Sequence, residues 1–468
     1  MMKNIVLKEL KELIRDGRFK IASIILLVLL LIATVTGVNQ YKKNTEQYSI
    51  SKTKERNIWE TQSEKNPHSA AHYGTYAFKP QFALSLFDYG VTQYTGSSIF
   101  LEAHNRNEAS FSEASDQTSL ARFGTLSINF VLIYLFPLII ILIGYNAYTK
   151  EFELKTFTLL KSQSVHPVKL ALGKWLATFL PILLLTALVF ITTGIILSNL
   201  QGVAFFSWMS LSVLFFTYTL YYAVITTLTV LISMWSKSSG VSLVSSLVIW
   251  VLFSFITPKI ATNFANSNHP YPSKSEFASR IAEDKQKGLD GHNPWSKAAK
   301  QLEIETLKEY GVDSISQLPF NYAGYRMQKG EEFEAQVYDK HYSILNDIAV
   351  NQNQTYKNLS FISPFVPIRF LSMDIANTSN NLHWKFTQAA EAYRLEKQKF
   401  LNYDIKDNMK VGERGYTMGA DKFKKLPKFK FTPPLLSEIL SENRQNILFI
   451  ALWLVLPFIG LIMTSKKI

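Results

Sequence analysis

The chain has 468 residues and contains no cysteine, so disulfides and thiolate metal sites are excluded. Its formal net charge of +13 would suit a nucleic-acid partner, but lysines that flank membrane segments explain such a balance more simply, and no nucleic acid is expected to bind. Apolar residues make up 47% of the chain and collect in long runs with charged residues between them, which is typical of a polytopic membrane protein.

Six apolar runs are candidates for transmembrane helices, each of which needs about 20 residues to cross a bilayer core. None of them contains an aspartate, glutamate, lysine, arginine or histidine, which argues against core helices of a soluble protein. The first run is interpreted as an uncleaved anchor, because no small-residue cleavage site follows it. The expected transmembrane helices are 21–38, 126–148, 176–197, 209–232, 241–256 and 446–463.

The distribution of lysine and arginine predicts the orientation of these helices. Basic residues gather in the first twenty residues, in the link 149–175 and in the tail 464–468, whereas the short link after the third run has no charge of either sign. Because short basic segments stay inside, both termini are expected in the cytoplasm. Residues 39–125 and 257–445 then form two large extracytoplasmic loops.

Residues 1–20 form the lead-in to the first transmembrane helix. Apolar residues such as Ile5, Leu10 and Leu13 recur at helical spacing, with lysines and glutamates on the opposite face. This pattern predicts a helix that lies in the inner membrane interface. A solvated lead-in that only sets the orientation is the alternative.

The first outer loop contains the stretch "NPHSAAHYGTYAFKP", in which His68 and His72 are four residues apart. One helix face could present both as nitrogen ligands, but zinc would need a third protein ligand, and the nearest acidic residues, Glu64 and Asp88, are only candidates. Histidines in a tyrosine-rich segment are more often structural and donate hydrogen bonds in a packed face. No metal site is therefore assigned.

The link 149–175 is expected to form an elbow. Its first part, Thr149–Leu160, is predicted to continue the second transmembrane helix, and "SQSVHP" then breaks that helix. Pro167 suits the first turn of the next helix. Such an elbow can press on a soluble partner, whereas a plain connecting loop is the alternative.

The second outer loop is predicted to be mostly helical. Helices are expected within 273–289, 294–314, 331–361 and 380–409, with Gly311 as a C-terminal cap of the second. The last two are expected to form an antiparallel pair separated by "SPFVPIRF". The basic stretch 421–436 is interpreted as an extended linker. The predicted fold class is an all-α polytopic membrane protein whose two large, mostly helical outer loops form one domain.

Several chemistries lack their sequence signatures. There is no G-x-x-x-x-G-K-[ST] phosphate loop, no H-E-x-x-H, no G-x-S-x-G and no EF-hand loop. The transmembrane runs also lack the charged residues that an ion-coupled carrier would use. No catalytic residue and no cofactor are assigned to this chain, and any uphill transport would need energy from another subunit.

The six runs, the basic lead-in and the broken link resemble the membrane subunit of ABC-2 type transporters. "LKELKELIRDGRF" is similar to the lead-in helix of those permeases, and "KEFELKTFTLLKSQSVHPVKLALGKW" resembles their link after the second span. Lys155 stands where glycine is common in that link, which leaves the local helix end open. Residues that the resemblance assigns to coupling with the ATPase are Glu151, Phe152, Lys155, Thr156, Leu159, His166, Pro167 and Lys169 in the link, and Lys8, Glu12 and Arg15 in the lead-in.

The outer loops resemble the ABC-2 permease group that carries an uncharacterised domain called DUF3526. The segments that carry this resemblance are "NPHSAAHYGTYAFKP", "SLFDYG", "FLEAHNRN", "SPFVPIRFLSMDIANTSN" and "FTQAAEAYRLEKQKFLN". The motif residues within them are Asn66, Pro67, His68, His72, Tyr73, Gly74, Glu102, His104, Arg369, Glu391, Tyr393 and Arg394.

The resemblance implies a permease of the bacterial inner membrane that pairs with a second copy or a sister permease. Two copies of a separate ATPase would bind ATP and magnesium and push on the link and the lead-in. The resemblance favours export, and the apolar spans favour a hydrophobic, amphipathic or peptide-like cargo. The outer domain would cap the exit or hand the cargo to a periplasmic or outer-membrane partner. The alternative is a mechanical transmitter that relays ATPase motion outward without moving cargo.

Overall fold

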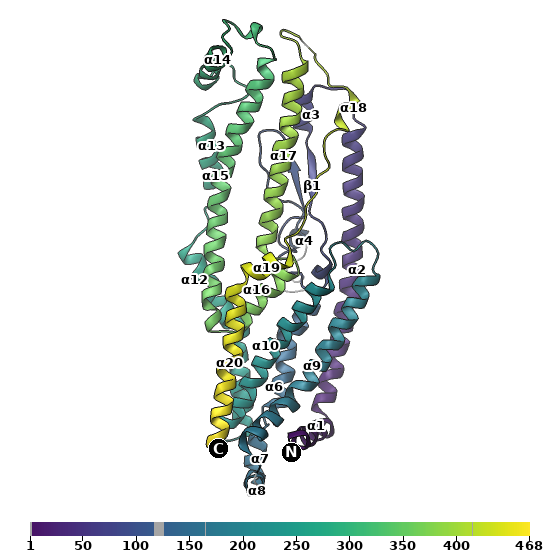
Figure 1. Ribbon diagram of the computed structural model, residues 1–468, viewed down its shortest axis with the longest axis vertical. Helices are drawn as coiled ribbons and strands as arrows, with labels where there is room; N and C mark the ends of the chain where they lie inside the picture. The colour runs from purple at the N-terminus through teal and green to yellow at the C-terminus, as the bar shows by residue number, and fades with distance from the viewer. Residues whose placement is uncertain (1, 117–125, 164, 414) are drawn as a thin grey trace.

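The computed structural model describes residues 2–116, 126–163, 165–413 and 415–468. Residues 117–125, at the end of the first predicted outer loop, position 164 in the link and position 414 in the second loop lie outside the described residues. The molecule is elongated and has three parts along its long axis (Figure 1). We call them the base (residues 2–16, 149–163 and 464–468), the bundle of six long helices, and the head (residues 61–116 and 269–435).

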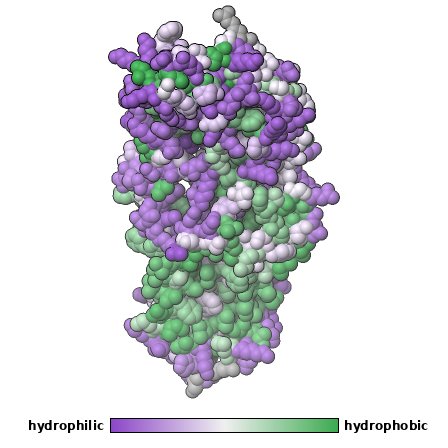
Figure 2. Space-filling model, turned by 45° about the horizontal axis from the view of Figure 1, so that its top comes forward, coloured by the Kyte–Doolittle hydropathy of each residue, from purple (hydrophilic) through white to green (hydrophobic). Residues whose placement is uncertain are grey.

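Six helices of the described chain are long and apolar enough to cross a membrane, in agreement with the six runs in the sequence. The run 126–148 begins just before its helix, and each of the other five runs lies inside its helix. Figure 2 shows that hydrophobic residues form a band between the polar head and a thinner polar end. The six helices are Arg18–Glu60, Ile128–Glu153, Pro167–Asn199, Trp208–Trp235, Ser239–Asn268 and Arg444–Lys467.

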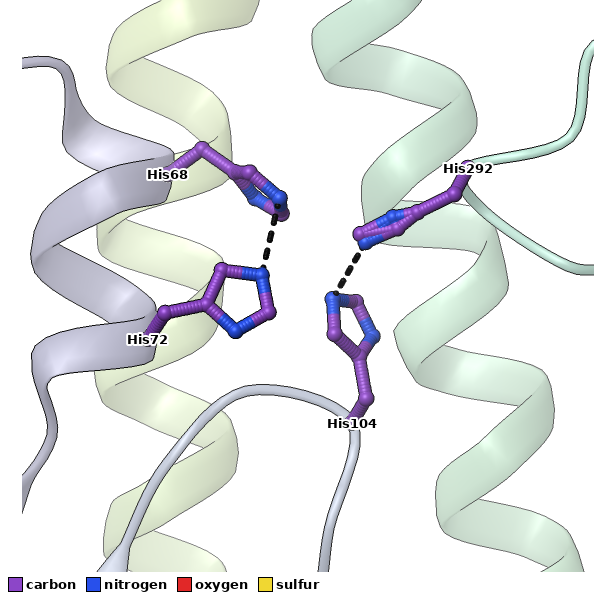
Figure 3. Close-up of side chains that lie close together, drawn as sticks. All are labelled: His68, His72, His104 and His292. Carbon is purple, nitrogen blue, oxygen red and sulfur yellow. Dashed lines mark hydrogen bonds between the residues drawn. The ribbon is translucent and has the colours of Figure 1, made fainter.

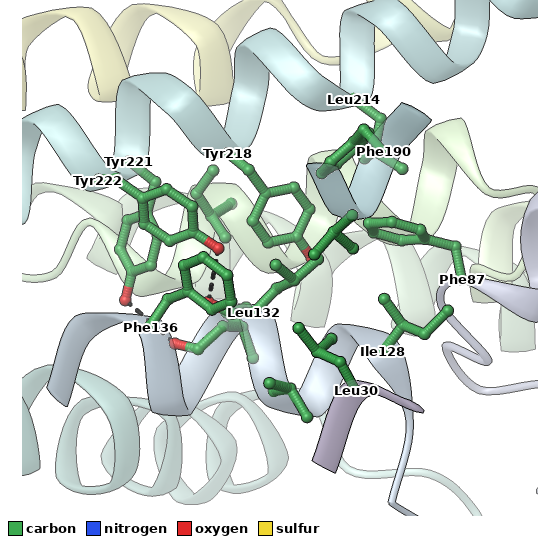
Figure 4. Close-up of a cluster of buried hydrophobic side chains, with 14 of the residues drawn as sticks. Leu30, Phe87, Ile128, Leu132, Phe136, Phe190, Leu214, Tyr218, Tyr221 and Tyr222 are labelled. Atoms are coloured by element: carbon green, nitrogen blue, oxygen red, sulfur yellow. Dashed lines mark hydrogen bonds between the residues drawn. The ribbon is translucent and has the colours of Figure 1, made fainter. Parts of the chain in front are cut away.

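The bundle is organised around α10 (Trp208–Trp235), which packs against α6, α9, α11, α16 and α20. Tyr218 and Tyr222 are fully buried on this helix (Figure 4). The Tyr222 ring stacks on Phe136 with ring centroids 5.1 Å apart, and its hydroxyl donates to the carbonyl oxygen of Leu132 at 2.9 Å. The Tyr218 hydroxyl donates to Asn129 Oδ1 at 2.5 Å. The rings therefore fill the core while their polar tips remain hydrogen-bonded.

Two of the long helices contain a π-helical turn just before a proline. The turn η3 (Val131–Leu135) precedes Pro137, and η4 (Leu252–Ile256) precedes Pro258. Proline has no N–H to donate to the preceding turn, so the local hydrogen-bond ladder must change there. The wider turn accommodates this change without ending the helix.

The base and the bundle are built from the following elements: α1 (Met2–Asp16), α2 (Arg18–Glu60), α5 (Ile128–Phe130), η3, α6 (Phe136–Gly144), α7 (Thr149–Glu153), α8 (Thr156–Ser162), α9 (Pro167–Asn199), α10, α11 (Ser239–Val251), η4, α12 (Thr257–Asn268) and α20 (Arg444–Lys467). Both chain termini lie at the base, beside α1, α7 and α8 (Figure 1). The upper half of α2 runs along one side of the head (Figure 1).

The head, with the short α19 that leads from it into α20, contains the remaining elements: α3 (Pro67–Tyr73), β1 (Thr75–Phe78), η1 (Ala83–Leu86), β2 (Ser98–Leu101), α4 (Glu113–Asp116), α13 (Lys274–Gln286), α14 (Lys297–Tyr310), η5 (Ile315–Gln317), α15 (Tyr322–Asn358), η6 (Leu359–Phe361), α16 (Phe365–Ile375), α17 (Asn380–Asn408), α18 (Ala420–Phe423) and α19 (Leu436–Glu442). Strands β1 and β2 pair antiparallel, with Thr75 opposite Leu101. The fold is thus nearly all-α, and the two-stranded sheet is a departure from the all-α prediction.

Helices α15 and α17 form the antiparallel pair that the sequence predicts, and they lie side by side in Figure 1. The backbone N–H of Asn321, just before α15, donates to the carbonyl oxygen of Lys406 near the end of α17. Further along the pair, Asn402 donates to Gln328 Oε1 at 3.2 Å. The predicted cap also holds, because Gly311 follows α14 with a left-handed φ of 63°.

Three helix boundaries differ from the predictions. The lead-in helix ends at Asp16 rather than at residue 20, because Gly17 adopts a φ of 80° that breaks the helix. The helix that contains the span predicted over 21–38 continues past that span to Glu60. The stretch "SPFVPIRF" does not merely separate two helices, because α16 begins within it.

Candidate functional site

The lead-in helix α1 lies against α9 at the base of the molecule. Gly173 on α9 permits this approach, because a Cβ atom there would lie 2.6 Å from a side-chain carbon of Ile5. The polar face of α1 then meets the link after the second long helix. The sequence predicted that these two segments share a function, and the structure brings them into contact.

Glu151, the acidic residue that the sequence singled out in the link, is the centre of this contact. Its Oε1 lies 2.9 Å from Lys8 Nζ on α1 and 3.2 Å from Lys174 Nζ on α9. The hydroxyl of Thr156 donates to the other carboxylate oxygen. Lys174 is nearly inaccessible and also lies 2.8 Å from Glu9 Oε1. A buried carboxylate and a buried ammonium are thus paired and hydrogen-bonded, as burial of charge requires.

A second ion pair strengthens the same contact. Lys150 pairs with Glu12, and Lys8 Nζ lies 3.2 Å from Glu12 Oε1. Burial alone would raise the pKa of Glu12, but the hydrogen bonds from Lys150 and Lys8 lower it. Burial alone would lower the pKa of Lys8, and the carboxylates of Glu9 and Glu151 raise it instead. The shifts in pKa thus favour the charged forms of both Glu12 and Lys8.

The link is bent rather than a straight continuation of the second helix, which corrects the prediction for Thr149–Leu160. Helix α7 ends near Leu154, Lys155 has a left-handed φ of 57°, and α8 starts at Thr156. Because left-handed backbone favours glycine, the position where glycine is common in ABC-2 permeases is also the position that bends here. Pro167 occupies the first turn of α9, as predicted.

The elbow formed by α7 and α8 extends from the end of the molecule (Figure 1). Phe152 and Phe157 pack edge to face inside it, with ring centroids 5.0 Å apart. Leu154 and Leu159 are 63% and 61% exposed. The predicted residues Arg15, His166 and Lys169 are also exposed, and no contact in the described part of the link or lead-in joins them to Glu151.

A second cluster of predicted residues lies in the head. Asn66 caps α3, its Oδ1 accepts the backbone N–H of His68 at 2.9 Å, and Pro67 occupies the first turn. His68 and His72 therefore project from one face of a short helix, and their Nε2 atoms are 3.0 Å apart. The structure thus confirms the shared helix face that the spacing suggested.

Two further histidines complete this cluster (Figure 3). His104 comes from the loop after β2, and His292 comes from the loop between α13 and α14. Their Nε2 atoms are 2.9 Å apart. One ligand atom from each of the four histidines lies within 4.8 Å of the others, so the group could hold a metal ion. The acidic candidates from the sequence, Glu64 and Asp88, are not members of this group in the described chain.

Two carboxylates contact the Nδ1 side of the His104 ring. Its Nδ1 lies 2.9 Å from Glu331 Oε1 and 3.3 Å from Glu334 Oε2, both on α15. The backbone N–H of His104 also donates to Glu331 Oε1 at 2.8 Å. Burial alone would lower the pKa of His104, but the two carboxylates raise it to about 9. Burial and the neighbouring imidazoles lower the pKa of His68 to about 4.

The predicted motif residue Arg394 anchors these carboxylates. Its guanidinium lies 3.1 Å from Glu331 Oε2, and it forms a two-pronged pair with Glu391 at 2.8 and 2.9 Å. Burial alone would raise the pKa of Glu331, but His104 and Arg394 lower it to about 2. The chain of contacts thus runs from Glu391 through Arg394 and Glu331 to His104.

The other predicted motif residues of the head have structural contacts. Gly74 has a φ of 72° and faces the Phe100 ring. Glu102 accepts hydrogen bonds from Asn105 and Asn107, and the Tyr393 hydroxyl donates to the Pro427 carbonyl oxygen at 2.7 Å. Tyr73 is mostly exposed.

Arg369, also a motif residue, serves the junction between the head and the bundle. Its Nη1 lies 3.0 Å from Asp88 Oδ1, and Ser372 donates to the other oxygen of the same carboxylate at 2.6 Å. Asp88 is 1% exposed. The loop before the second long helix is thereby fixed to α16.

Sequence reasoning missed several residues of both clusters. Lys174 is a lone lysine two residues before the apolar run 176–197, and that position could have marked it as a partner for Glu151. No sequence pattern around His292 marks it as a ligand. Even so, four of the chain's eight histidines, including His292, lie together in this cluster. Glu331 and Glu334 have the i, i+3 spacing of one helix face, but that spacing does not indicate that both contact His104.

Comparison with known proteins gives one family match. A family model described as "Domain of unknown function (DUF3526)" matches residues 274–432, which include His292, Glu331 and Arg394. His68, His72 and His104 lie outside that match. No curated protein matches the chain.

Proposed function

We propose that this chain is the membrane-spanning permease subunit of an ATP-driven exporter of the ABC-2 type. In this proposal it lies in a bacterial inner membrane with its base and both termini in the cytoplasm. Two copies of a separate ATPase subunit bind ATP and magnesium and act on the base. The chain pairs with a second copy of itself or with a sister permease.

The observation that carries this proposal is the connection of the elbow to two helices through Glu151. A force applied to α8 reaches α1 through Lys8 and reaches α9 through Lys174, because all three contact one carboxylate. Packed, ion-paired elements of this kind move together rather than deform. ATPase closure would therefore tilt α9 and the lead-in as one unit.

The surface of the elbow supports a soluble partner. Leu154 and Leu159 expose their side chains on a segment that projects from the end of the molecule (Figure 1). Exposed leucines on a projecting short helix suit insertion into a groove of a partner. The concentration of lysine and arginine in residues 1–20 and 149–175 is the sequence feature that favours a cytoplasmic base.

The cargo in this proposal is hydrophobic, amphipathic or peptide-like. The long helices lack charged residues over their apolar runs, so they offer no ionic site for a charged substrate at the depth of the membrane. The head would cover the exit of such a path, or pass the cargo to an envelope partner.

A second candidate function is mechanical transmission without cargo, and the length of α2 favours it. This helix has 43 residues and extends for about 65 Å at 1.5 Å per residue, roughly twice the thickness of a bilayer core. It joins the base to the side of the head without a break (Figure 1). Motion at the base could therefore reach the head through one rigid element.

The orientation can be tested with single cysteines, because the natural chain has none. A Gln163→Cys variant in the elbow should react with a membrane-impermeant maleimide only from the cytoplasmic side. A Trp295→Cys variant in the head, where the side chain is 78% exposed, serves as the matched control and should react only from the outside. Labelling of position 163 from the periplasm would contradict the proposal.

Coupling can be tested in vesicles that contain the chain and its ATPase. Leu159→Asp should abolish binding of the ATPase, whereas Leu184→Asn, on the lipid-facing part of α9, should leave it intact. Cargo accumulation with ATP hydrolysis would support export. ATPase stimulation by an envelope protein without accumulation would support mechanical transmission, and failure of any ATPase to bind would contradict both.

A further inference from the structure

The strongest unassigned feature of the molecule is the meeting of four histidines in the head. They come from three segments: α3 supplies His68 and His72, the loop after β2 supplies His104, and the loop after α13 supplies His292. His68 and His292 are 224 positions apart, and four of the chain's eight histidines are involved. Imidazoles have no hydrophobic reason to gather at a half-exposed surface, so their convergence needs a chemical cause.

The geometry of the nitrogens fits a transition-metal ion. The two closest pairs of Nε2 atoms are 3.0 and 2.9 Å apart, and a ligand atom of each histidine lies within 4.8 Å of the other three. Tetrahedral zinc with bonds of about 2.0–2.1 Å places its nitrogen ligands about 3.3 Å from one another. Small side-chain rotations would bring the four nitrogens to that spacing, because the rings already point toward a common centre (Figure 3).

The side chains around His104 hold it as a metal-ligating histidine is held. Its Nδ1 faces Glu331 and Glu334, which leaves Nε2 directed at the other histidines. A carboxylate behind a ligating histidine fixes the ring and the tautomer and makes the free nitrogen more basic. Lys285 and Tyr338 also donate to the His104 carbonyl oxygen at 3.1 Å, so its backbone is held as well as its ring.

The nearby carboxylates are better outer partners than direct ligands. Glu331 is already engaged by Arg394, and Lys285 lies 3.0 Å from Glu334 Oε1. Their negative charge lies behind His104, where it offsets the charge of a bound cation. The direct ligand set is then four neutral nitrogens, which favours ions that prefer imidazole over ions such as Mg²⁺ or Ca²⁺ that prefer oxygen.

We propose that His68, His72, His104 and His292 bind one Zn²⁺ ion, with Glu331 and Glu334 as positioning residues for His104. The ion would join the first outer loop to the second, because α3 and His104 belong to one and His292 to the other. His72 and His292 are exposed, so zinc can enter from solution without unfolding of the head. This inference is independent of the transport proposal.

The test uses the full chain in detergent, purified through a tag that contains no histidine and stripped with EDTA. After exposure to zinc and removal of excess ion, elemental analysis should find one zinc per chain. Thermal unfolding should shift upward by about 3 °C when zinc exceeds its dissociation constant a hundredfold. Cobalt in place of zinc should give the intense visible absorption of a tetrahedral site.

The key variant is His72→Ala/His292→Ala, because both side chains are exposed and contribute little to packing. It should lose stoichiometric zinc, the cobalt absorption and the thermal shift, while its unfolding temperature in EDTA equals that of the wild type. His269→Ala, which removes a histidine outside the cluster, is the matched control and should retain all three signals. Glu334→Gln should weaken zinc binding about tenfold.

Two results would overturn the proposal. One is wild-type protein that holds no stoichiometric zinc after exposure. The other is zinc retention and a thermal shift that persist unchanged in the double variant, which would place the ion elsewhere. Comparison of unfolding temperatures in EDTA separates loss of metal from loss of fold.

Discussion

Glu151 Oε1 lies 2.9 Å from Lys8 Nζ and 3.2 Å from Lys174 Nζ, so one carboxylate joins the lead-in helix, the elbow and the third long helix. The two lysines differ in environment, since the Lys8 side chain is 46% exposed and the Lys174 side chain 2%. Exposed ion pairs contribute little to stability, whereas a buried charge that loses one of its two partners loses more: without Glu151, Lys174 keeps only Glu9, and without Lys174, Glu151 keeps only Lys8.

Glu151→Gln and Lys174→Met should therefore each destabilise the chain by about 1.5–3 kcal/mol, and Lys8→Ala by less than about 1 kcal/mol. The double variant Glu151→Gln/Lys174→Met should lose less than the sum of the single losses, because it removes both buried charges together. Unfolding by denaturant in detergent measures these differences. Strictly additive losses would show that the two residues do not depend on each other.

The bend at Lys155 leads to a second prediction. A residue with a side chain is strained at a φ of 57°, and glycine is not. Lys155→Gly should leave stability unchanged or raise it by up to about 1 kcal/mol, whereas Lys155→Val should lower it by about 1–2 kcal/mol, because β-branched residues tolerate this conformation worst. Thermal unfolding of the wild type and the two variants under the same conditions measures these differences in stability. A glycine variant less stable than the valine variant would contradict the bend.

Gly74 provides a third prediction. Its φ is 72°, and an added Cβ would overlap the Phe100 ring. Gly74→Ala should therefore destabilise the head by about 1–3 kcal/mol through strain and overpacking. Gly240→Ala is the matched control, because no atom lies within 4 Å of its added Cβ and it sits in a helix, where alanine is favoured by up to about 1 kcal/mol. Equal unfolding temperatures for the two variants would argue against the Phe100 contact.

The sequence predicted the apolar helices well, because a bilayer span leaves a local signature that needs no partner. The uncharged runs, the cap at Gly311 and the proline at the start of α9 were all readable from consecutive residues. The antiparallel pairing of α15 and α17 followed from two amphipathic runs joined by a short break. Glu151 and His104 were selected as candidate site residues because the sequence resembles a known family, and not because of a local sequence pattern.

What the sequence could not predict depends on distant contacts. Glu151 pairs with both Lys8 and Lys174 because α1 packs on α9, and no local sequence pattern specifies that packing. His68 and His72 lacked further ligands in the sequence because His104 and His292 lie 32 and 220 positions after His72, and no local pattern joins them to it. The strands β1 and β2 were missed for the same reason, since each has only four residues and its partner lies beyond a long irregular connection.

Lys397 leads to a final prediction, which concerns pH. Its side chain is fully buried in the head, where Nζ donates to the Leu101 carbonyl oxygen at 2.8 Å and to Thr75 Oγ1 at 3.1 Å. Burial lowers the pKa of Lys397 to about 7, although the charges of Glu55 and Glu102 raise it and that of Arg394 lowers it further. In the unfolded chain the same lysine titrates near about 10.4.

Between pH 7 and about 10.4 the unfolded state therefore binds more protons at Lys397 than the folded state, so this residue makes stability rise with pH across that window. Its contribution is complete above the unfolded pKa and is lost as pH falls through about 7. The difference in unfolding free energy between wild type and Lys397→Met should thus increase in favour of the wild type from pH 7 to pH 9.5. Thermal unfolding of both proteins across this range measures it, with Lys399→Met, which removes an exposed lysine of the same helix, as the control. A wild-type advantage that is constant with pH would mean that Lys397 keeps its proton in the folded head.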